Sequence, residues 1–295
     1  MEDDRYPLCP GPDPEPRAPR IEIPAGACDT HAHVFGPEEK YPLSPRRGYT
    51  PPPCPLEDYF RLHRILGIER GVLVQASAYG TDNAMIMDAL AGESGRLRAV
   101  AAVDGSVTDA ELERMNEAGV RGIRINLADP GGNPFASFDE IGLMAERIQS
   151  LGWHMEFLIH VNDFPDIRKT FSALAVDSVF GHLGYIPTSE GTGHPGFREF
   201  LNLVRDGRAW VKLTAPNRIT GLDRPPYRDV DPFGRALVEA NPDRMLWGSD
   251  WPHVYFFKFC PNDGDILDQL ADWAPDEAVR RKILVDNPAA LYGFR

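Results

Sequence analysis

The chain has 295 residues, of which 42% are hydrophobic and 25% are charged, and its formal net charge is −13. This length suits a single α/β barrel, and the composition is that of a globular protein. The acidic balance argues against a nucleic-acid surface, and no run of about 18 apolar residues is present that could cross a membrane. The four cysteines are far apart and form no C-x-x-C pair, so we expect a cytoplasmic protein with reduced thiols.

The N-terminal stretch is acidic and rich in proline, and it lacks the apolar segment of a secretory signal. Closely spaced prolines prevent both a helix and a central strand, so an extended arm is predicted over 1–24. A single folded domain is then predicted over 25–295. A second proline-rich stretch, at 37–55, predicts a long loop.

Beyond the arm, buried strands and helices are expected to alternate. A continuous apolar run predicts a strand that is buried on both faces, which is typical of a parallel sheet. About eight such strands separated by helices favour an α/β fold of the closed (β/α)8 TIM-barrel type, and no G-x-G-x-x-G motif indicates a dinucleotide fold. The predicted strands lie at 27–34, 70–77, 96–104, 119–127, 153–160, 177–184, 209–214 and 243–250, and the predicted helices at 56–67, 82–94, 108–118, 137–151, 164–175, 195–206, 230–240 and within 262–292.

Polar residues stand where these predicted strands end. In a (β/α)8 barrel the C-terminal ends of the strands form the active-site mouth, so these side chains are expected to converge there. In chain order they are Asp29, His31, His33, Gln75, Ser77, Asp104, Arg124, Asn126, Glu156, His160, His182, Lys212, Thr214 and Asp250.

His31 and His33 are two positions apart in a predicted strand, so their imidazoles point to the same face. Such a pair could either bind a metal ion or hold a substrate, and the spacing alone does not decide between these roles. A lone histidine after a strand is more often a hydrogen-bonded structural residue, and His160 is interpreted in this way. No role in the site is expected for His63, His154 and His194.

Arg124 lies within a predicted apolar strand. An unpaired charge there would be costly, so Arg124 needs either a carboxylate partner or an anionic ligand. Glu156 is the candidate partner. His182 and Asp250 each follow a strongly apolar strand and are expected to face the same mouth.

Three motifs carry a resemblance to a known family: D-T-H-A-H at 29–33, G-H-L-G at 181–184 and W-G-S-D-W-P-H at 247–253. Together they resemble the amidohydrolase superfamily, in particular the amidohydrolase 2 branch, which includes 2-pyrone-4,6-dicarboxylate lactonase and sugar-acid lactonases. The stretches at 72–84, 119–127, 210–218 and 285–294 are also similar to that group, so the likeness covers the chain from about residue 25 to its end.

The resemblance implies a hydrolase that opens the ring of a small anionic lactone. Asp250 would be the general base that activates water, and His31, His33 and His182 would complete the catalytic set. In one version His31, His33 and Asp250 hold a single divalent ion, with zinc the expected metal. In the other version, which the resemblance favours, no metal is required and the histidines bind the substrate directly. Members with two metal ions use a lysine after the fourth strand, and 119–132 contain none.

The resemblance also implies substrate-binding roles for Arg124, Arg218, Ser77 and Asn126, because a guanidinium fork suits a carboxylate. The chain departs from the pyrone lactonase at 128–132, where basic residues are replaced by Ala-Asp-Pro-Gly-Gly. A dicarboxylate would therefore lose one contact unless Arg46, Arg47 or Lys212 replaces it.

Other functions remain open from the sequence. A zinc-dependent decarboxylase and a lactone isomerase of the same superfamily would use similar groups, and a barrel that only binds a sugar acid is a non-enzymatic alternative. No nucleic-acid or membrane partner is expected, and the sequence is compatible with a homo-oligomer.

Overall fold

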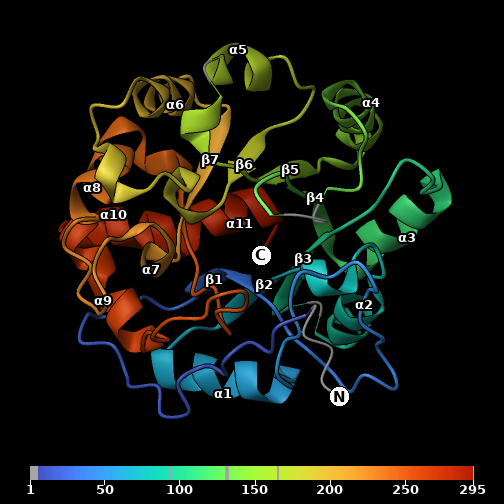
Figure 1. The fold of residues 1–295 in the computed structure, drawn as a ribbon, viewed down its shortest axis with the longest axis horizontal. Helices are drawn as coiled ribbons and strands as arrows, with labels where there is room; N and C mark the ends of the chain where they lie inside the picture. The colour runs from blue at the N-terminus through green and yellow to red at the C-terminus, as the bar shows by residue number, and fades with distance from the viewer. Residues whose placement is uncertain (1–5, 94, 130–132, 165, 295) are drawn as a thin grey trace.

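The computed structural model describes residues 6–93, 95–129, 133–164 and 166–294. Eight parallel strands follow one another around a barrel in the order β1 to β8, and helices surround them (Figure 1). The predicted (β/α)8 barrel is confirmed. The strands are β1 (Cys28–Ala32), β2 (Arg70–Val74), β3 (Leu97–Ala101), β4 (Val120–Asn126), β5 (His154–Leu158), β6 (Ser178–Phe180), β7 (Ala209–Leu213) and β8 (Met245–Trp247).

The helices between the strands lie near the predicted positions. The sequence shows why they begin and end there: Thr108 and Glu111 form a capping box at the start of α3, and Gly119 ends that helix with a φ of 115°. The helices are α1 (Leu56–Leu66), α2 (Ala84–Leu90), α3 (Asp109–Ala118), α4 (Phe138–Ile148), α5 (Ile167–Ser172), α6 (Pro195–Arg205), α7 (Pro216–Ile219), α8 (Asp231–Ala240), α9 (Asp263–Trp273), α10 (Glu277–Arg281) and α11 (Asn287–Tyr292).

Two differences from the expected elements matter for the mouth of the barrel. The strand predicted at 177–184 ends at Phe180, because His182 and Leu183 have φ angles of 51° and 53°, which lie in the left-handed region and end a strand. The helical turn α7 is not among the predicted elements, and it carries Arg218.

The barrel closes between β1 and the segment that follows β8. The amide of Asp250 donates to the carbonyl of His31 at 2.8 Å, and the amide of His33 donates to the carbonyl of Trp251 at 2.8 Å. His31 in β1 and His33 in the turn after it are thus hydrogen-bonded directly to the turn that carries Asp250.

The interior of the barrel is packed at the end opposite the mouth. The C-terminal residues Tyr292 and Phe294 pack there with apolar side chains such as Cys28 and Trp210, which lie near the starts of their strands. The C-terminus accordingly lies near the centre of the view in Figure 1. The Tyr292 ring also contacts His154, the first residue of β5, at a centroid distance of 5.3 Å.

The N-terminal segment lies against the outside of α9. Arg17 forms ion pairs with Asp265 and with Asp268, the second at 2.6 Å, and Asn262 donates to Asp13 at 2.9 Å. The division into an arm over 1–24 and a domain over 25–295 stays a prediction. Within the described part of the chain, none of the helices has the length and apolar character that a bilayer crossing requires.

Helix α4 offers a direct test of the packing. Ile141 is 1% exposed and faces the barrel, whereas Leu143 on the same helix is 62% exposed. We expect Ile141→Ala to lower the free energy of unfolding by about 2–4 kcal/mol, because it leaves a cavity in a close-packed layer. Leu143→Ala should change it by less than about 0.5 kcal/mol. Urea unfolding of both variants measures the difference, and equal effects would contradict the packing described here.

Candidate active site

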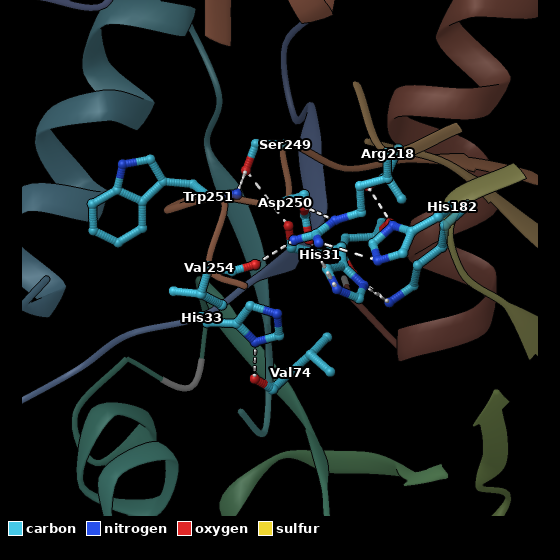
Figure 2. Close-up of polar contacts among 12 residues, drawn as sticks. His31, His33, Val74, His182, Arg218, Ser249, Asp250, Trp251 and Val254 are labelled. Atoms are coloured by element: carbon cyan, nitrogen blue, oxygen red, sulfur yellow. Dashed lines mark hydrogen bonds and ion pairs between the residues drawn. The ribbon is translucent and has the colours of Figure 1, made fainter. Parts of the chain in front are cut away.

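Three histidines face one another at the mouth of the barrel (Figure 2). His31 and His33 come from β1 and the turn after it, and His182 comes from the turn after β6. The His31 ring lies 5.1 Å from each of the other two rings, centroid to centroid, and all three side chains are buried. The two-residue spacing therefore brings the first pair together as predicted.

Asp250 completes this group. It follows β8 with a φ of 65°, and its Oδ1 atom lies 3.7 Å from His31 Nε2 and 3.8 Å from His182 Nε2. Its other oxygen, Oδ2, accepts a hydrogen bond from Arg218 Nε at 2.8 Å. Asp250 Oδ1 and His31 Nε2 are both buried without a hydrogen-bond partner among the described residues. Buried polar atoms are almost always paired, so these two atoms mark where a ligand or water binds.

A buried carboxylate behind the site fixes the turn that carries Asp250. Asp29 accepts hydrogen bonds from the amide of Ser249 at 2.9 Å, from its hydroxyl at 2.6 Å, and from the amide of His31 at 3.1 Å. Ser249 Oγ in turn accepts from the amide of Trp251 at 3.0 Å, as Figure 2 shows. The sequence predicts Asp29 at the mouth. In the structure its carboxylate holds Ser249 and His31 in place through hydrogen bonds.

Glu156 and Lys212 form an ion pair inside the barrel, below His31. Lys212 Nζ lies 2.5 Å from Glu156 Oε2 and donates to the carbonyl of Thr30 at 2.6 Å. His31 Nδ1 lies 3.1 Å from Glu156 Oε1 and 3.4 Å from Lys212 Nζ. The Nδ1 side of His31 is thus engaged with the buried pair, which leaves Nε2 for the mouth.

This pair corrects two expectations from the sequence. Glu156 is not the partner of Arg124: although they are neighbours across β4 and β5, the carboxylate turns to Lys212 and His31. Lys212 is fully buried beneath the mouth, so it cannot replace a substrate-binding cation there.

The three histidines are neutral. Burial and the Arg124 guanidinium lower the pKa of His33 to about 3. Burial, followed by the nearby Lys212 charge, lowers the pKa of His31 well below its ordinary value, and burial with Arg218 does the same for the pKa of His182. A neutral imidazole carries one N–H and one lone pair. Because His33 Nδ1 lies 2.8 Å from the Val74 carbonyl, Nδ1 carries the proton and Nε2 is an acceptor (Figure 2).

The two arginines at the mouth differ in their hydrogen-bond and ion-pair partners. Arg218 is paired: besides Asp250, it donates to the carbonyl of Val254 at 2.7 Å. Arg124 is 9% exposed, and its described hydrogen bond is a long one, 3.4 Å to the carbonyl of Gln75. No ion pair involving Arg124 occurs among the described residues.

The remaining predicted residues are placed as follows. Asn126 holds its own loop, since its Nδ2 donates to Asp129 and its Oδ1 accepts from the amides of Ala128 and Asp129. His160 is structural as expected, with Nδ1 2.7 Å from the Tyr185 carbonyl and its ring stacked on that tyrosine. The departure noted at 128–132 falls partly on 130–132, which lie outside the described residues.

One residue of the site is absent from those that the sequence predicts. Tyr49 is buried in the proline-rich loop, and its hydroxyl faces Ser77, a predicted substrate-binding residue. The signal in the sequence that points to Tyr49 is its place in a long loop that follows the histidine pair.

The donor set fits a single divalent ion. His31, His182 and Asp250 each offer one ligand atom, and these atoms lie within 4.8 Å of one another. Two imidazole nitrogens and a carboxylate oxygen are ordinary zinc ligands. This group contains His182 and not His33. The ligand set that the sequence predicts, His31, His33 and Asp250, therefore stays a prediction.

Neutral imidazoles, a carboxylate with an unpartnered oxygen and two guanidiniums at the mouth of a (β/α)8 barrel define an enzyme active site. The chain belongs to the amidohydrolase family, whose model matches residues 28–294.

Three relatives are similar to this chain over almost its whole length. The 4-sulfomuconolactone hydrolase of Hydrogenophaga intermedia is 39% identical over 292 residues, covering 97% of this chain and 95% of that protein. The 2-pyrone-4,6-dicarboxylate hydrolase of Comamonas testosteroni is 39% identical over 289 residues, covering 94% and 93%. The D-galactarolactone isomerase of Agrobacterium fabrum (strain C58) is 31% identical over 280 residues, covering 93% and 94%.

Removing Asp29 tests the link between β1 and the Asp250 turn. In Asp29→Ala the three donors that Asp29 accepts from lose their partner in a buried place, so we expect the free energy of unfolding to fall by about 3 kcal/mol or more. Urea unfolding measures the change. The exposed Asp163 provides the control, and Asp163→Ala should be close to neutral. A stability of Asp29→Ala equal to that of the control would show that this link is unimportant.

Proposed function

We propose that this enzyme hydrolyses the ring ester of a small anionic lactone, with Asp250 as the general base. The observation that carries the proposal is the geometry of Asp250 Oδ1, which is buried and unpartnered and faces the Nε2 atoms of His31 and His182. The names of the hydrolase relatives, which refer to lactone substrates, support the same reaction class.

The reaction follows from the positions of these groups. Arg218 fixes the carboxylate through Oδ2, so that Oδ1 accepts a proton from a water molecule in the mouth. The oxygen of that water attacks the lactone carbonyl, and the tetrahedral intermediate places negative charge on the former carbonyl oxygen. Collapse breaks the ring C–O bond, and the proton held by Asp250 passes to the leaving oxygen, which gives an open-chain acid.

The histidines orient the reactants. His182 Nε2 lies 3.8 Å from Asp250 Oδ1, and as an N–H group it is placed to donate to the carbonyl oxygen as charge develops. His31 Nδ1 faces the Glu156 carboxylate, so its Nε2 is an acceptor that can orient the attacking water. His33 presents an acceptor at Nε2, because its Nδ1 proton is held by Val74. That acceptor suits a proton of the attacking water. A divalent ion held by His31, His182 and Asp250 would, when bound, polarise the carbonyl.

The substrate is proposed to be anionic because Arg124 is buried without a counter-ion in the described part of the chain. Substrate-binding roles for Arg124, Arg218, Ser77 and Asn126 accordingly remain part of the proposal. The free thiols are compatible with the cytoplasmic location predicted from the sequence. Assembly into a homo-oligomer stays a prediction.

Lactone isomerisation is the second candidate, and the similarity to a D-galactarolactone isomerase favours it. In that reaction a hydroxyl of the substrate, instead of water, would attack the carbonyl, and the same base would serve. A panel of aldonolactones, muconolactones and pyrone carboxylates, assayed in ¹⁸O-labelled water, separates the two. Hydrolysis places ¹⁸O in the acid product, whereas isomerisation leaves the label in the solvent. Carbon dioxide release from an aromatic acid, with no lactone consumed, would instead indicate a decarboxylase.

Replacing the base tests the mechanism. We expect Asp250→Asn to lower kcat about 10³-fold while substrate still binds, because an amide cannot take the proton from water. Initial rates of acid release and calorimetric binding of substrate provide the two readouts. Asp163→Asn, at an exposed aspartate outside this group, should retain full activity. Undiminished turnover in Asp250→Asn would place the base elsewhere.

Metal removal tests the role of an ion. Arg218 donates to Asp250 Oδ2 at 2.8 Å, so this carboxylate already has a positively charged partner, which weakens its attraction for a divalent ion. We therefore expect purified enzyme to contain far less than one zinc per chain and to keep its turnover after dialysis against a chelator. Stoichiometric metal, with turnover lost on chelation and restored by zinc, would contradict this expectation.

A further inference from the structure

A buried ion pair lies beneath His31, inside the barrel. Glu156 comes from β5 and Lys212 from β7, and their side chains are 2% and 0% exposed. Because both charges lose their water on burial, an ion pair of this kind is weak evidence for stability. Neither side chain is a reacting group in the proposed hydrolysis. The contacts that the pair makes with His31 indicate a different role.

The hydrogen bonds of the pair favour one tautomer of His31. Lys212 Nζ donates to Glu156 Oε2 at 2.5 Å and to the Thr30 carbonyl at 2.6 Å. The other carboxylate oxygen, Oε1, lies 3.1 Å from His31 Nδ1, whereas Lys212 Nζ is 3.4 Å from that nitrogen. A carboxylate oxygen accepts hydrogen bonds, and a bare Nδ1 would direct its lone pair at that oxygen. The pair therefore favours the tautomer with the proton on Nδ1.

The tautomer of His31 decides whether the proposed base is available. His31 Nε2 and Asp250 Oδ1 lie 3.7 Å apart, and both are buried without a hydrogen-bond partner among the described residues. With the proton on Nδ1, both atoms are acceptors, so a water molecule in the mouth can donate one hydrogen to each. With the proton on Nε2, the imidazole would instead direct an N–H group at Oδ1 and compete with water for that oxygen.

We propose that Glu156 and Lys212 are positioning residues that hold His31 in the Nδ1–H tautomer and thereby keep Asp250 Oδ1 free to accept a proton from water. The proposal rests on the proposed function and adds to it two residues that lie beneath the mouth. Glu156 supplies the acceptor for the Nδ1 proton. Lys212 supplies the positive charge that a buried carboxylate requires.

Glu156→Gln tests the tautomer. The ammonium of Lys212 can only donate, so the oxygen of the new amide turns to Lys212 and the amide NH₂ group turns to His31. Two N–H groups would then face each other, and we expect the His31 proton to move from Nδ1 to Nε2. Nitrogen-15 NMR of histidine-labelled enzyme distinguishes protonated from bare imidazole nitrogens, and the loss of signals in His31→Asn assigns those of His31. For a lactone that the enzyme hydrolyses, kcat should fall about 10²-fold with little change in KM.

Removing the cation as well separates positioning from a merely structural role. In the double variant Glu156→Gln/Lys212→Met the amide oxygen is released from Lys212 and can accept from His31 Nδ1. We expect the NMR signals to return to the wild-type pattern and kcat to recover about 10-fold relative to Glu156→Gln. A merely structural pair predicts no recovery, because the second substitution removes a further buried contact. Asp231→Asn is the matched control: this buried carboxylate accepts from Trp273 Nε1 at 3.0 Å, and its loss should change neither the His31 signals nor kcat.

The wild-type spectrum by itself can overturn the proposal, since a His31 proton on Nε2 would contradict it whether or not the variants fold. A double variant no more active than Glu156→Gln would also overturn it. If the proton moves and returns as expected but no lactone is consumed, the control of the tautomer stands and lactone hydrolysis fails. If lactones are hydrolysed and Glu156→Gln leaves the His31 signals unchanged, lactone hydrolysis stands and the positioning role fails.

Discussion

The hydrogen bonds around Asp29 are the constraint on which the site depends. A barrel of eight strands must join its last strand to its first, and here the join includes the turn that carries Asp250. Asp29 on β1 accepts from the amide and hydroxyl of Ser249, while the amide of Asp250 donates to the His31 carbonyl. Burial raises the pKa of Asp29 to about 6, although the hydrogen bonds from Ser249 oppose that rise. The same hydrogen bonds therefore close the barrel and bring Asp250 beside His31.

The charges at the mouth follow from that arrangement. Glu156 is paired with Lys212, and Asp250 is paired with Arg218, so two buried carboxylates and two buried cations neutralise each other. Arg124 is left over, because its neighbour across the sheet, Glu156, is already engaged. Burial first, and the nearby cations after it, lower the pKa values of the three histidines and keep them neutral.

Much of this could be predicted from the sequence, because strand periodicity and barrel topology are local or general rules. The spacing of His31 and His33 predicts a shared face, and the ends of apolar runs predict a common mouth. The partner of Arg124 could not be predicted, because Glu156 has two cations within reach and only the packing inside the barrel selects Lys212. Tyr49 and Arg46 lie in an irregular loop, whose path no periodicity specifies. The turn α7 could not be predicted for a similar reason: it spans Pro216–Ile219, which is too short for a helical pattern to be visible.

The mouth of the barrel has two parts, which come from different strands. The proposed reacting groups come from β1 and the turns after β6 and β8. Backbone hydrogen bonds join β1 to the turn after β8, and the turn after β6 places the His182 ring 5.1 Å from that of His31. The cavity beside Arg124 is lined instead by residues at the ends of β2, β3 and β4 and by the loop at 44–46. A substitution in that loop changes the wall of the cavity without touching the bonds that place Asp250.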